Sequence, residues 1–541
     1  MMRSRKYGVV YTPTSLADFT ANLIYNVAIE NSLEIKTVLD PASGECSLLM
    51  SAHKFFGDQV AYKGIDVDNE AVKNTPEGYS VIHNDAILPF NVKGETAKYW
   101  KNKLPRIDAI IANPPWSTEK IYARETLQNA GFSLVSGQYD SYVLFIELSF
   151  NILPENGLMA FIIPDSLFDA QNTNLRKFLC EKTQICVIAR LGEKIFDEVA
   201  RSATVIVCKK IIPEAETITQ CFRLSTSDRH AFLAGANTLM TFFEKNVHYV
   251  PQCRFTNNDG YIFDIDTKVT DEALLNKIEA TSQSLSKLFT FGRGIEISKA
   301  GKIVYCPVCG CAQGYKKKQL QEGSKNCTAC GQTIPVNEQV IENVIGKVKT
   351  DVTVPVYVGE DLHRYSLMPG NYIIQNIKGI NYKSNELYFP PKLCIRKTGL
   401  GIYCAIDYTS TFVTQTVYIL KYQNQRNNVP LEFYLAILNS RVVYYYYLKV
   451  YGENEWKSHP YLTKQIIFDL PILIYENTDE DARIVKLAKQ LMQNYDHATD
   501  LKLEQLIMDR YKLTETERQM ISDEMSRLPD LSAVNDMKME G

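Results

Sequence analysis

The feature that most constrains this chain is an apolar run that ends abruptly, Ile107-Asp-Ala-Ile-Ile-Ala-Asn113-Pro114-Pro115-Trp116. The β-branched run predicts a buried strand. Prolines cannot donate to a sheet ladder, so the strand ends there and leaves Asn113 at its carboxyl end, where open α/β sheets bind ligands. The Asn113 amide and the Pro114 carbonyl offer acceptors for a planar NH2 group, and Trp116 offers a face for a flat ring. The alternative is a strand followed by an ordinary turn.

The region before this run contains a strand, a small-residue turn and a helix in succession. An amphipathic stretch over 16–29 follows Thr12-Pro13 and predicts a helix. The apolar run 37–40 then leads into the turn Asp40-Pro-Ala42-Ser-Gly44-Glu-Cys46, and helical periodicity resumes over 47–56. This order predicts the first unit of a doubly wound fold, whose turn lets the backbone approach a bound cofactor. An ordinary strand-to-helix turn is the alternative.

Two further predicted strands also end in acids. The strand that begins at Tyr62 leads to Asp66, and the strand that begins at Ser80 leads to Asp85. Asp66 lies at the spacing where such folds place a carboxylate on ribose hydroxyls, and Asp85 is suited to the cofactor's adenine. A solvated strand end or a helix cap is the alternative for each acid.

Strands and helices continue to alternate after the organising run. Periodicity predicts helices over 139–153 and 174–181 and strands over 157–163, 185–189 and 203–207. We therefore expect an α/β fold with a mostly parallel sheet covered on both faces. Phe196 lies in a turn of this region, either as a core residue or as a second ring near Trp116.

Two cysteine pairs mark the second half of the chain. Cys306-Pro-Val-Cys309 and Cys327-Thr-Ala-Cys330 are separated by 17 residues, a zinc-ribbon spacing. Four thiolates fill a tetrahedral zinc and leave no open position, so the predicted site is structural. A redox pair is the alternative, although it accounts for one pair and not for two. The lysines at 316–318 are suited either to phosphate contact or to a solvated loop.

The remaining segments predict helices and sheet without a repeat. Periodicity predicts helices over 274–288, 431–447, 479–494 and 501–525 and a strand over 392–397. Four consecutive tyrosines, Tyr444–Tyr447, fit packing between domains better than base stacking.

Composition narrows the class of protein. Of 541 residues, 45% are hydrophobic and 22% are charged, as in globular proteins. The most apolar stretch, 431–450, contains Glu432, Arg441 and Lys449 and does not predict a membrane span. No signal sequence precedes the first motif, so we expect a cytoplasmic protein whose 13 cysteines are thiols or metal ligands. The net charge of -3 gives no global sign of nucleic-acid binding, although a local basic groove remains open.

In this order, the motifs resemble those of the gamma-class DNA adenine-N6 methyltransferases of the TaqI type. The resemblance implies transfer of a methyl group from S-adenosylmethionine to an adenine that is flipped out of duplex DNA. It assigns cofactor binding to Thr12, Pro13, Asp40, Ala42, Gly44, Asp66 and Asp85. It assigns the catalytic site to Asn113, Pro114, Pro115, Trp116 and the second aromatic, Phe196.

The resemblance also implies an architecture. We expect a Rossmann-like, doubly wound, seven-stranded methyltransferase sheet over residues 1–245. A target-recognition domain of the α+β class would follow over 246–478, with the zinc ribbon at about 303–335, and C-terminal helices over 479–541. Expected partners are double-stranded DNA and a separately encoded restriction endonuclease, with the chain acting as a monomer. The chain opens directly on the first motif, so no N-terminal nuclease is expected.

Three points qualify the resemblance. The family's cofactor turn usually ends in glycine, and Cys46 occupies that position, where it either crowds the cofactor or lies on the helix flank. The same tetrapeptide also occurs in enzymes that methylate cytosine N4, RNA bases or a protein glutamine. A DNA-binding relative without turnover is a further alternative. Cytosine-C5 chemistry is excluded because it needs a cysteine after proline, and the chain has no Pro-Cys pair.

Overall fold

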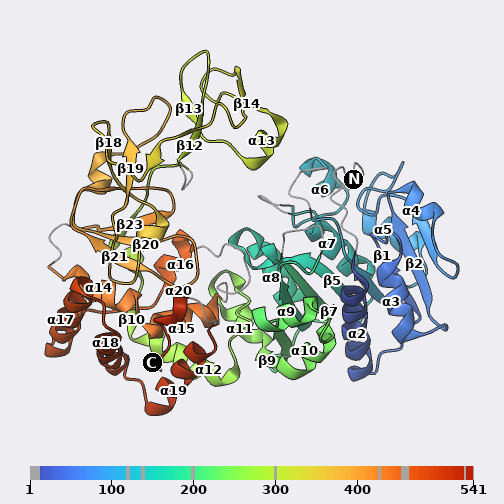
Figure 1. Ribbon diagram of the computed structural model, residues 1–541. Coiled ribbons are helices and arrows are strands. Elements are labelled where there is room, and N and C mark those ends of the chain that lie inside the picture. The colour runs from blue at the N-terminus through green and yellow to red at the C-terminus, as the bar shows by residue number, and fades with distance from the viewer. Residues whose placement is uncertain are drawn as a thin grey trace. The chain divides into compact units, whose positions relative to one another are not determined.

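The computed structural model describes residues 12–116, 122–135, 140–196, 202–297, 301–424, 428–451, 462–528 and 532–539. The chain forms two compact units, the first ending at Asp271 and the second beginning at Glu272 (Figure 1). The first unit therefore extends past residue 245, the position at which the sequence pattern placed its end. Residues 248–251 form the last strand of the first unit's sheet, which explains why they belong to that unit.

A nine-stranded sheet forms the centre of the first unit, in the order β3-β2-β1-β4-β5-β7-β6-β8-β9. The first five strands in that order run parallel, and β7 is antiparallel to β5 and β6. The expected seven strands are present, and β8 and β9 extend the sheet beyond them. The strands are β1 (Thr37–Asp40), β2 (Ala61–Asp66), β3 (Ser80–His83), β4 (Ala109–Ala112), β5 (Leu158–Pro164), β6 (Gln184–Gly192), β7 (Ala203–Lys209), β8 (Ile218–Arg223) and β9 (His248–Pro251).

Helices cover both faces of this sheet, as expected (Figure 1). Strand β4 shows why, because Ala109 and Ile111 face one apolar cluster while Ile110 and Ala112 face the other. Helices α2, α3 and α10 contribute to the first cluster, and α5, α7 and α8 to the second. The α-helices of this unit are α2 (Thr14–Glu30), α3 (Ser47–Phe56), α4 (Asn69–Lys73), α5 (Thr96–Lys103), α6 (Arg124–Asn129), α7 (Tyr142–Ile152), α8 (Thr173–Lys182), α9 (Thr226–Leu233), α10 (Leu239–Asn246) and α11 (Gln252–Asn257).

The second unit contains two four-stranded sheets, in the orders β11-β23-β20-β21 and β17-β19-β18-β22. Three short β-pairings accompany them, β13-β12-β16, β14-β15 and β10-β24. The strands are β10 (Ser282–Gln283), β11 (Phe289–Arg293), β12 (Lys302–Tyr305), β13 (Ala312–Gln313), β14 (Ser324–Asn326), β15 (Thr333–Pro335), β16 (Glu342–Asn343), β17 (Ile345–Gly346), β18 (Thr353–Tyr357), β19 (Asn371–Ile374), β20 (Lys392–Arg396), β21 (Cys404–Asp407), β22 (Phe412–Val413), β23 (Val417–Tyr422) and β24 (Ile472–Leu473).

The helices of the second unit pack around one large apolar cluster, in which Tyr444–Tyr447 are buried as packing residues. They are α12 (Val269–Ala280), α13 (Lys317–Glu322), α14 (Leu431–Leu438), α15 (Arg441–Val450), α16 (Lys464–Asp469), α17 (Asp479–Gln493), α18 (His497–Arg510), α19 (Glu515–Ser526) and α20 (Ser532–Asn535). Within the described ranges, no helix of either unit combines the length and apolarity that a membrane span requires.

Three predicted helices differ from those observed. The helix expected over 274–288 ends at Ala280, where α12 gives way to a short strand. The helix expected over 431–447 is two helices, because Ser440 caps α15 by accepting the Val443 amide. Asn439, at the break, bonds both backbone groups of Cys404 on the neighbouring strand. The stretch 501–525 likewise divides into α18 and α19.

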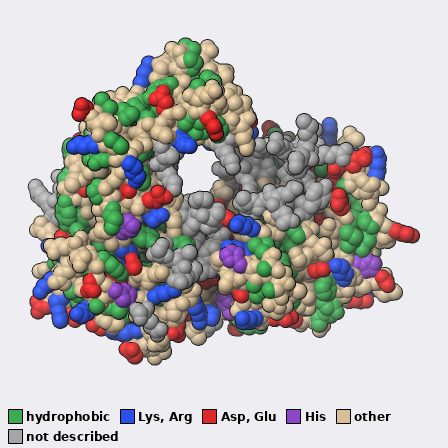
Figure 2. Space-filling view, viewed as in Figure 1, with side chains coloured by type: hydrophobic (Ala, Val, Ile, Leu, Met, Phe, Trp, Pro, Cys, Tyr) green, Lys and Arg blue, Asp and Glu red, His purple; other side chains and the backbone are tan. Residues whose placement is uncertain are grey.

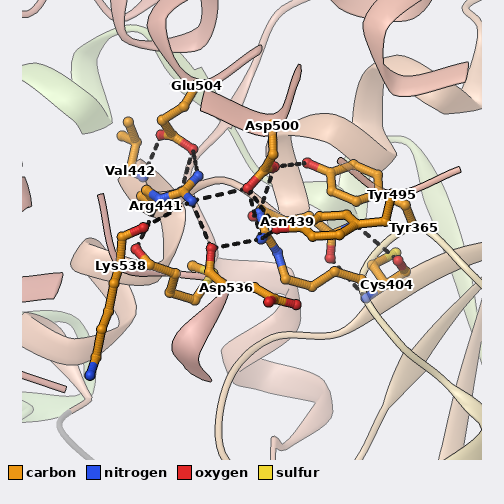
Figure 3. Close-up of polar contacts among 12 residues, drawn as sticks. Tyr365, Cys404, Asn439, Arg441, Val442, Tyr495, Asp500, Glu504, Asp536 and Lys538 are labelled. Atoms are coloured by element: carbon orange, nitrogen blue, oxygen red, sulfur yellow. Dashed lines mark hydrogen bonds and ion pairs between the residues drawn. The ribbon is translucent and has the colours of Figure 1, made fainter. Parts of the chain in front are cut away.

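A buried ionic network fixes the chain's C-terminal segment within this unit (Figure 3). Asp500 pairs with the guanidinium groups of Arg364 and Arg441 at 2.9 and 3.0 Å, and Glu504 accepts the Arg441 backbone amide at 2.9 Å. Burial raises the pKa of Asp500, but the two arginines outweigh it and hold that pKa below its usual value. The backbone carbonyls of 536–538 accept further bonds from the two arginines. The predicted C-terminal helices therefore pack into the core of the second unit.

Candidate active site

Strand β4 delivers the Asn113–Trp116 tetrapeptide to the carboxyl edge of the sheet. All four residues of β4 are buried, and the strand lies between β1 and β5 in parallel register. The tetrapeptide directly follows β4, and its prolines end the hydrogen-bonding ladder of the strand. The carboxyl ends of β1, β2 and β3 lie along the same edge, because these strands run parallel to β4. This is the edge where open α/β sheets bind ligands.

Hydrogen bonds from distant parts of the chain hold two members of the tetrapeptide. The Asn113 side-chain Nδ2 donates to the Thr12 hydroxyl at 2.9 Å. Thr12 immediately precedes Pro13, whose carbonyl accepts the Leu16 and Ala17 amides in the first turn of α2. The Trp116 indole Nε1 donates to the Ile162 carbonyl of β5 at 3.3 Å, so the ring is anchored against the neighbouring strand.

A serine that the sequence did not single out holds a third member. The Ser141 hydroxyl, immediately before α7, donates to the Pro115 carbonyl. The preceding Asp140 is buried and accepts the Ser166 hydroxyl at 2.5 Å. These bonds tie the start of α7 to the tetrapeptide and to the segment after β5. No sequence signal marked Ser141, because a serine before a helix usually serves only as a cap.

Trp116 and Phe196 lie together, as the sequence expectation required. Their ring centroids are 5.1 Å apart with an interplanar angle of 85°, an edge-to-face contact. Both rings are buried, with exposed fractions of 6% and 2%. Because the rings touch each other, a base can lie between them only after they separate.

The cofactor turn is held by two acids. Asp40 Oδ1 accepts the Ala42 amide at 2.9 Å, and Asp66 Oδ2 accepts the Gly44 amide at 2.7 Å. Asp66 Oδ1 also accepts the Asp68 amide at 2.8 Å. The two carboxylates thus lie at the ends of adjacent strands and shape the turn between β1 and α3.

Burial perturbs both of these carboxylates. It raises the pKa of Asp40 to about 8, with a smaller contribution from the charge of Asp66 and an opposing one from the Ala42 amide. Burial also raises the pKa of Asp66 above its ordinary value, against the amides that lower it. A buried carboxylate of this kind is stabilised by a bound cation. The edge is therefore suited to a positively charged ligand.

Asp85, which follows the third strand, β3, accepts hydrogen bonds from a different part of the chain. Its Oδ1 accepts the Ile87 and Leu88 amides at 2.8 and 3.1 Å, and its Oδ2 accepts the Tyr122 hydroxyl at 2.6 Å. Asp85 therefore orders the loop after β3 and joins it to the segment after the tetrapeptide. The pattern of acid-ended strands identified Asp85, whereas nothing in the sequence identified Tyr122.

The structure shows the backbone conformation of Cys46 and the place of its side chain. Its φ is +66°, in the left-handed region that favours glycine, which explains why glycine usually occupies this position. Its side chain is fully buried in the apolar cluster beneath α2 and α3. Burial raises the pKa of this thiol to about 12, so it remains protonated. The side chain thus packs into the protein core at the start of α3.

The four predicted metal ligands come together in the second unit. The sulfurs of Cys306, Cys309, Cys327 and Cys330 all lie within 4.8 Å of one another. The Cys306–Cys330 and Cys309–Cys327 separations are 3.6 and 3.7 Å. A tetrahedral site with bonds of about 2.3 Å has sulfur–sulfur edges of about 3.8 Å, so this geometry fits zinc. Gln313 donates to the Cys327 sulfur at 2.9 Å, a supporting bond typical of metal sites.

Two family models match the chain. Residues 2–239 match the model described as N-6 DNA Methylase, and residues 354–472 match the TaqI-like C-terminal specificity domain. The chain carries an N-6 DNA methylase domain followed by a TaqI-like specificity domain. The tetrapeptide and the three acids lie in the N-6 DNA methylase domain, whereas the four-cysteine cluster lies between the two matched regions.

Individual relatives resemble parts of this chain. The type II methyltransferase M.AccI of Acinetobacter calcoaceticus is 27% identical over 215 residues, which are 38% of this chain and 37% of that protein. A nuclease-deletion mutant of the type ISP restriction-modification enzyme LlaGI, solved with a DNA substrate mimic, is similar in fold with a TM-score of 0.53. That match is 12% identical and covers 90% of this chain and 54% of the other. The chain thus spans only part of the length of both relatives.

Proposed function

We propose that this protein is a site-specific DNA methyltransferase that transfers a methyl group from S-adenosylmethionine to the N6 amine of adenine in duplex DNA. The observation that carries the proposal is the placement of Asn113-Pro-Pro-Trp116 at the carboxyl end of β4, beside the acid-ended strands β1, β2 and β3. This edge combines acceptors for an exocyclic amine with acids suited to a cationic donor.

The proposed chemistry depends on hydrogen-bond acceptors. The N6 lone pair of adenine is delocalised into the ring, so the amine is a poor nucleophile. The Asn113 Oδ1 and the Pro114 carbonyl accept its two N–H bonds and thereby favour a tetrahedral nitrogen. When bound, the donor would supply its methyl group as a sulfonium and leave as the neutral thioether. The N6 nitrogen would gain the methyl group and release one proton to solvent. Positioning and electrostatics supply the catalysis, without a covalent enzyme intermediate.

In this proposal, the donor lies along the acid-lined edge. Thr12, Pro13, Asp40, Ala42, Gly44, Asp66 and Asp85 form its site. Asp66 would accept ribose hydroxyls through the remaining lone pairs of its oxygens, and Asp85 would hold the adenine of the donor. The target base would be flipped onto Trp116, and Phe196 would move from its contact with that ring.

The second unit would select the DNA sequence. The TaqI-like specificity domain supports this assignment, and Cys306, Cys309, Cys327 and Cys330 would hold one structural zinc that orders the preceding module. Figure 2 shows Lys and Arg interspersed with Asp and Glu over the visible face, in keeping with the net charge of -3. DNA binding would therefore rest on local contacts to phosphates.

We place the protein in a restriction-modification system, with double-stranded DNA as its substrate. A separately encoded restriction endonuclease would be the companion activity. We propose that the protein acts as a monomer in the cytoplasm, where its DNA substrate lies. For the domains, the proposal keeps a methyltransferase region, a target-recognition region and C-terminal helices, with the first boundary moved to Asp271.

The test is the identity of the product. Purified protein is incubated with S-adenosylmethionine and unmethylated DNA, and the nucleosides are analysed by mass spectrometry. The proposal expects N6-methyladenine within a short defined sequence and no N4-methylcytosine. Label found in cytosine, in RNA or in a protein glutamine would replace it with the corresponding alternative. Absence of transfer despite donor binding by calorimetry would indicate a DNA-binding relative without turnover.

A further inference from the structure

The contact between Thr12 and Asn113 suggests a second role for the leading motif. The Asn113 Nδ2 donates to the Thr12 hydroxyl at 2.9 Å across 101 positions of sequence. The resemblance assigns Thr12 to the cofactor, yet its hydroxyl contacts the side chain whose oxygen is proposed to receive the target amine. Thr12 is positioned by Pro13, whose carbonyl begins α2, a helix buried against the sheet.

The orientation of the Asn113 amide matters to the proposed reaction. A carboxamide has an acceptor oxygen on one side and a donor NH2 on the other. Turned one way, its oxygen accepts an N6–H bond of adenine. Turned the other way, its NH2 meets the NH2 of adenine, and two donors face each other. In the structure Nδ2 donates to Thr12, so Oδ1 lies on the opposite side of the amide, the side proposed for the target amine.

We infer that Thr12 is a positioning residue that orients the Asn113 amide, so that Oδ1 faces the target amine. This inference rests on the proposed function and adds to it a role that the cofactor motif alone does not imply. Thr12 acts through Asn113 and does not touch the target base. Polarisation along the chain of hydrogen bonds also strengthens Oδ1 as an acceptor.

The inference predicts a defect in turnover rather than in donor binding. Thr12→Val keeps the shape of the side chain and removes the acceptor. The loss of one oriented hydrogen bond should slow methyl transfer about 3- to 10-fold in single-turnover assays. The rate should be measured at saturating S-adenosylmethionine, so that a change in donor affinity does not contribute to it. Thr12→Ser should restore this rate because it keeps the hydroxyl.

A matched control separates this effect from a general loss of threonine hydroxyls. Thr20 lies on α2 and is fully buried, and its hydroxyl donates to the Leu16 carbonyl at 2.8 Å. Thr20→Val makes the same chemical change without reaching Asn113. It should leave the single-turnover rate unchanged.

Asn113→Asp provides the decisive comparison. A carboxylate presents an oxygen on either side, so its orientation no longer matters. Thr12→Val should therefore slow transfer in the Asn113 protein and have little effect in the Asn113→Asp background, a coupling that a double-mutant cycle measures. Equal losses in both backgrounds, or a weakened donor affinity with normal turnover, would overturn the inference. Failure of the wild-type protein to methylate adenine would instead refute the proposed function.

Discussion

Replacement of one metal ligand should unfold the four-cysteine module and leave the methylase domain intact. The sulfur separations of 3.6 and 3.7 Å match the edges of about 3.8 Å expected for tetrahedral zinc. Serine is a much weaker zinc ligand than a thiolate, so Cys306→Ser should lose the metal. Cys311 is buried in the same module and lies outside the cluster, so Cys311→Ser is a matched control.

The small core of the module sets the size of the effect. Besides two ligands, the fully buried part of its apolar cluster is Val304, Ile334 and Val336, with Tyr315, Leu320 and Ile341 partly buried against them. Burial of the three fully buried side chains contributes roughly 5–9 kcal/mol in total. The module extends from β12 to β15, and a structural zinc contributes about 10–16 kcal/mol.

Metal analysis and limited proteolysis provide the assay. Wild-type and Cys311→Ser proteins should contain about one zinc per chain, and Cys306→Ser about none. The segment 302–335 should become protease-sensitive in Cys306→Ser, and DNA affinity should fall while donor affinity is retained. Zinc-free protein in which this segment stays resistant would refute the reasoning.

The remaining predictions concern the catalytic edge, the ionic network and DNA. Asn113→Ala should lower methyl transfer at least about 100-fold with an unchanged circular dichroism spectrum, and near-normal turnover would remove Asn113 from the reaction. The pKa of Asp40 is raised to about 8, so Asp40 is protonated below that pH, and a cationic donor favours its ionised form. Donor affinity measured by calorimetry should therefore rise with pH up to about 8 and then level off. If the affinity of Asp40→Asn depends on pH in the same way, this assignment is contradicted. Asp500→Asn leaves Arg364 and Arg441 buried without their shared carboxylate and should destabilise the second unit by about 3–5 kcal/mol in denaturant titrations, whereas a loss below about 1 kcal/mol would show the network to be dispensable. DNA affinity should fall steeply with salt, and a flat dependence in binding titrations would argue against phosphate contacts.

Much of the first unit could be predicted because its elements repeat a simple pattern. Strands β1 and β2 end in Asp40 and Asp66, β4 leads into Asn113-Pro114, and α3 follows β1 with an apolar face. Strands β8 and β9 could not be predicted, because β8 joins the sheet by pairing with β6 and β9 by pairing with β8, and these pairings depend on the fold. The helix break at Asn439 also depends on a tertiary partner, since its side chain bonds the backbone of Cys404.

Some residues of the site could likewise be identified from the sequence, and others could not. The four cysteines were identified from their spacing, and Asn113 from its place between an apolar strand and two prolines. The structure brings the four cysteines together. Ser141 and Tyr122 could not be identified, because a serine before a helix and a tyrosine in a loop are common everywhere. Their significance comes from partners that folding brings near them from distant parts of the chain.

The charge on the catalytic edge follows from the reaction that we propose. Methyl transfer discharges a sulfonium, so acids that held this cation strongly would stabilise the reactants and raise the barrier. Both oxygens of Asp66 accept backbone amides, which disperses its charge, and Asp40 has a pKa of about 8. At neutral pH, the turn therefore carries less negative charge than two free carboxylates. Such an edge can attract a cationic donor without opposing the loss of its charge, while neutral acceptors at Asn113 and Pro114 remain for the amine.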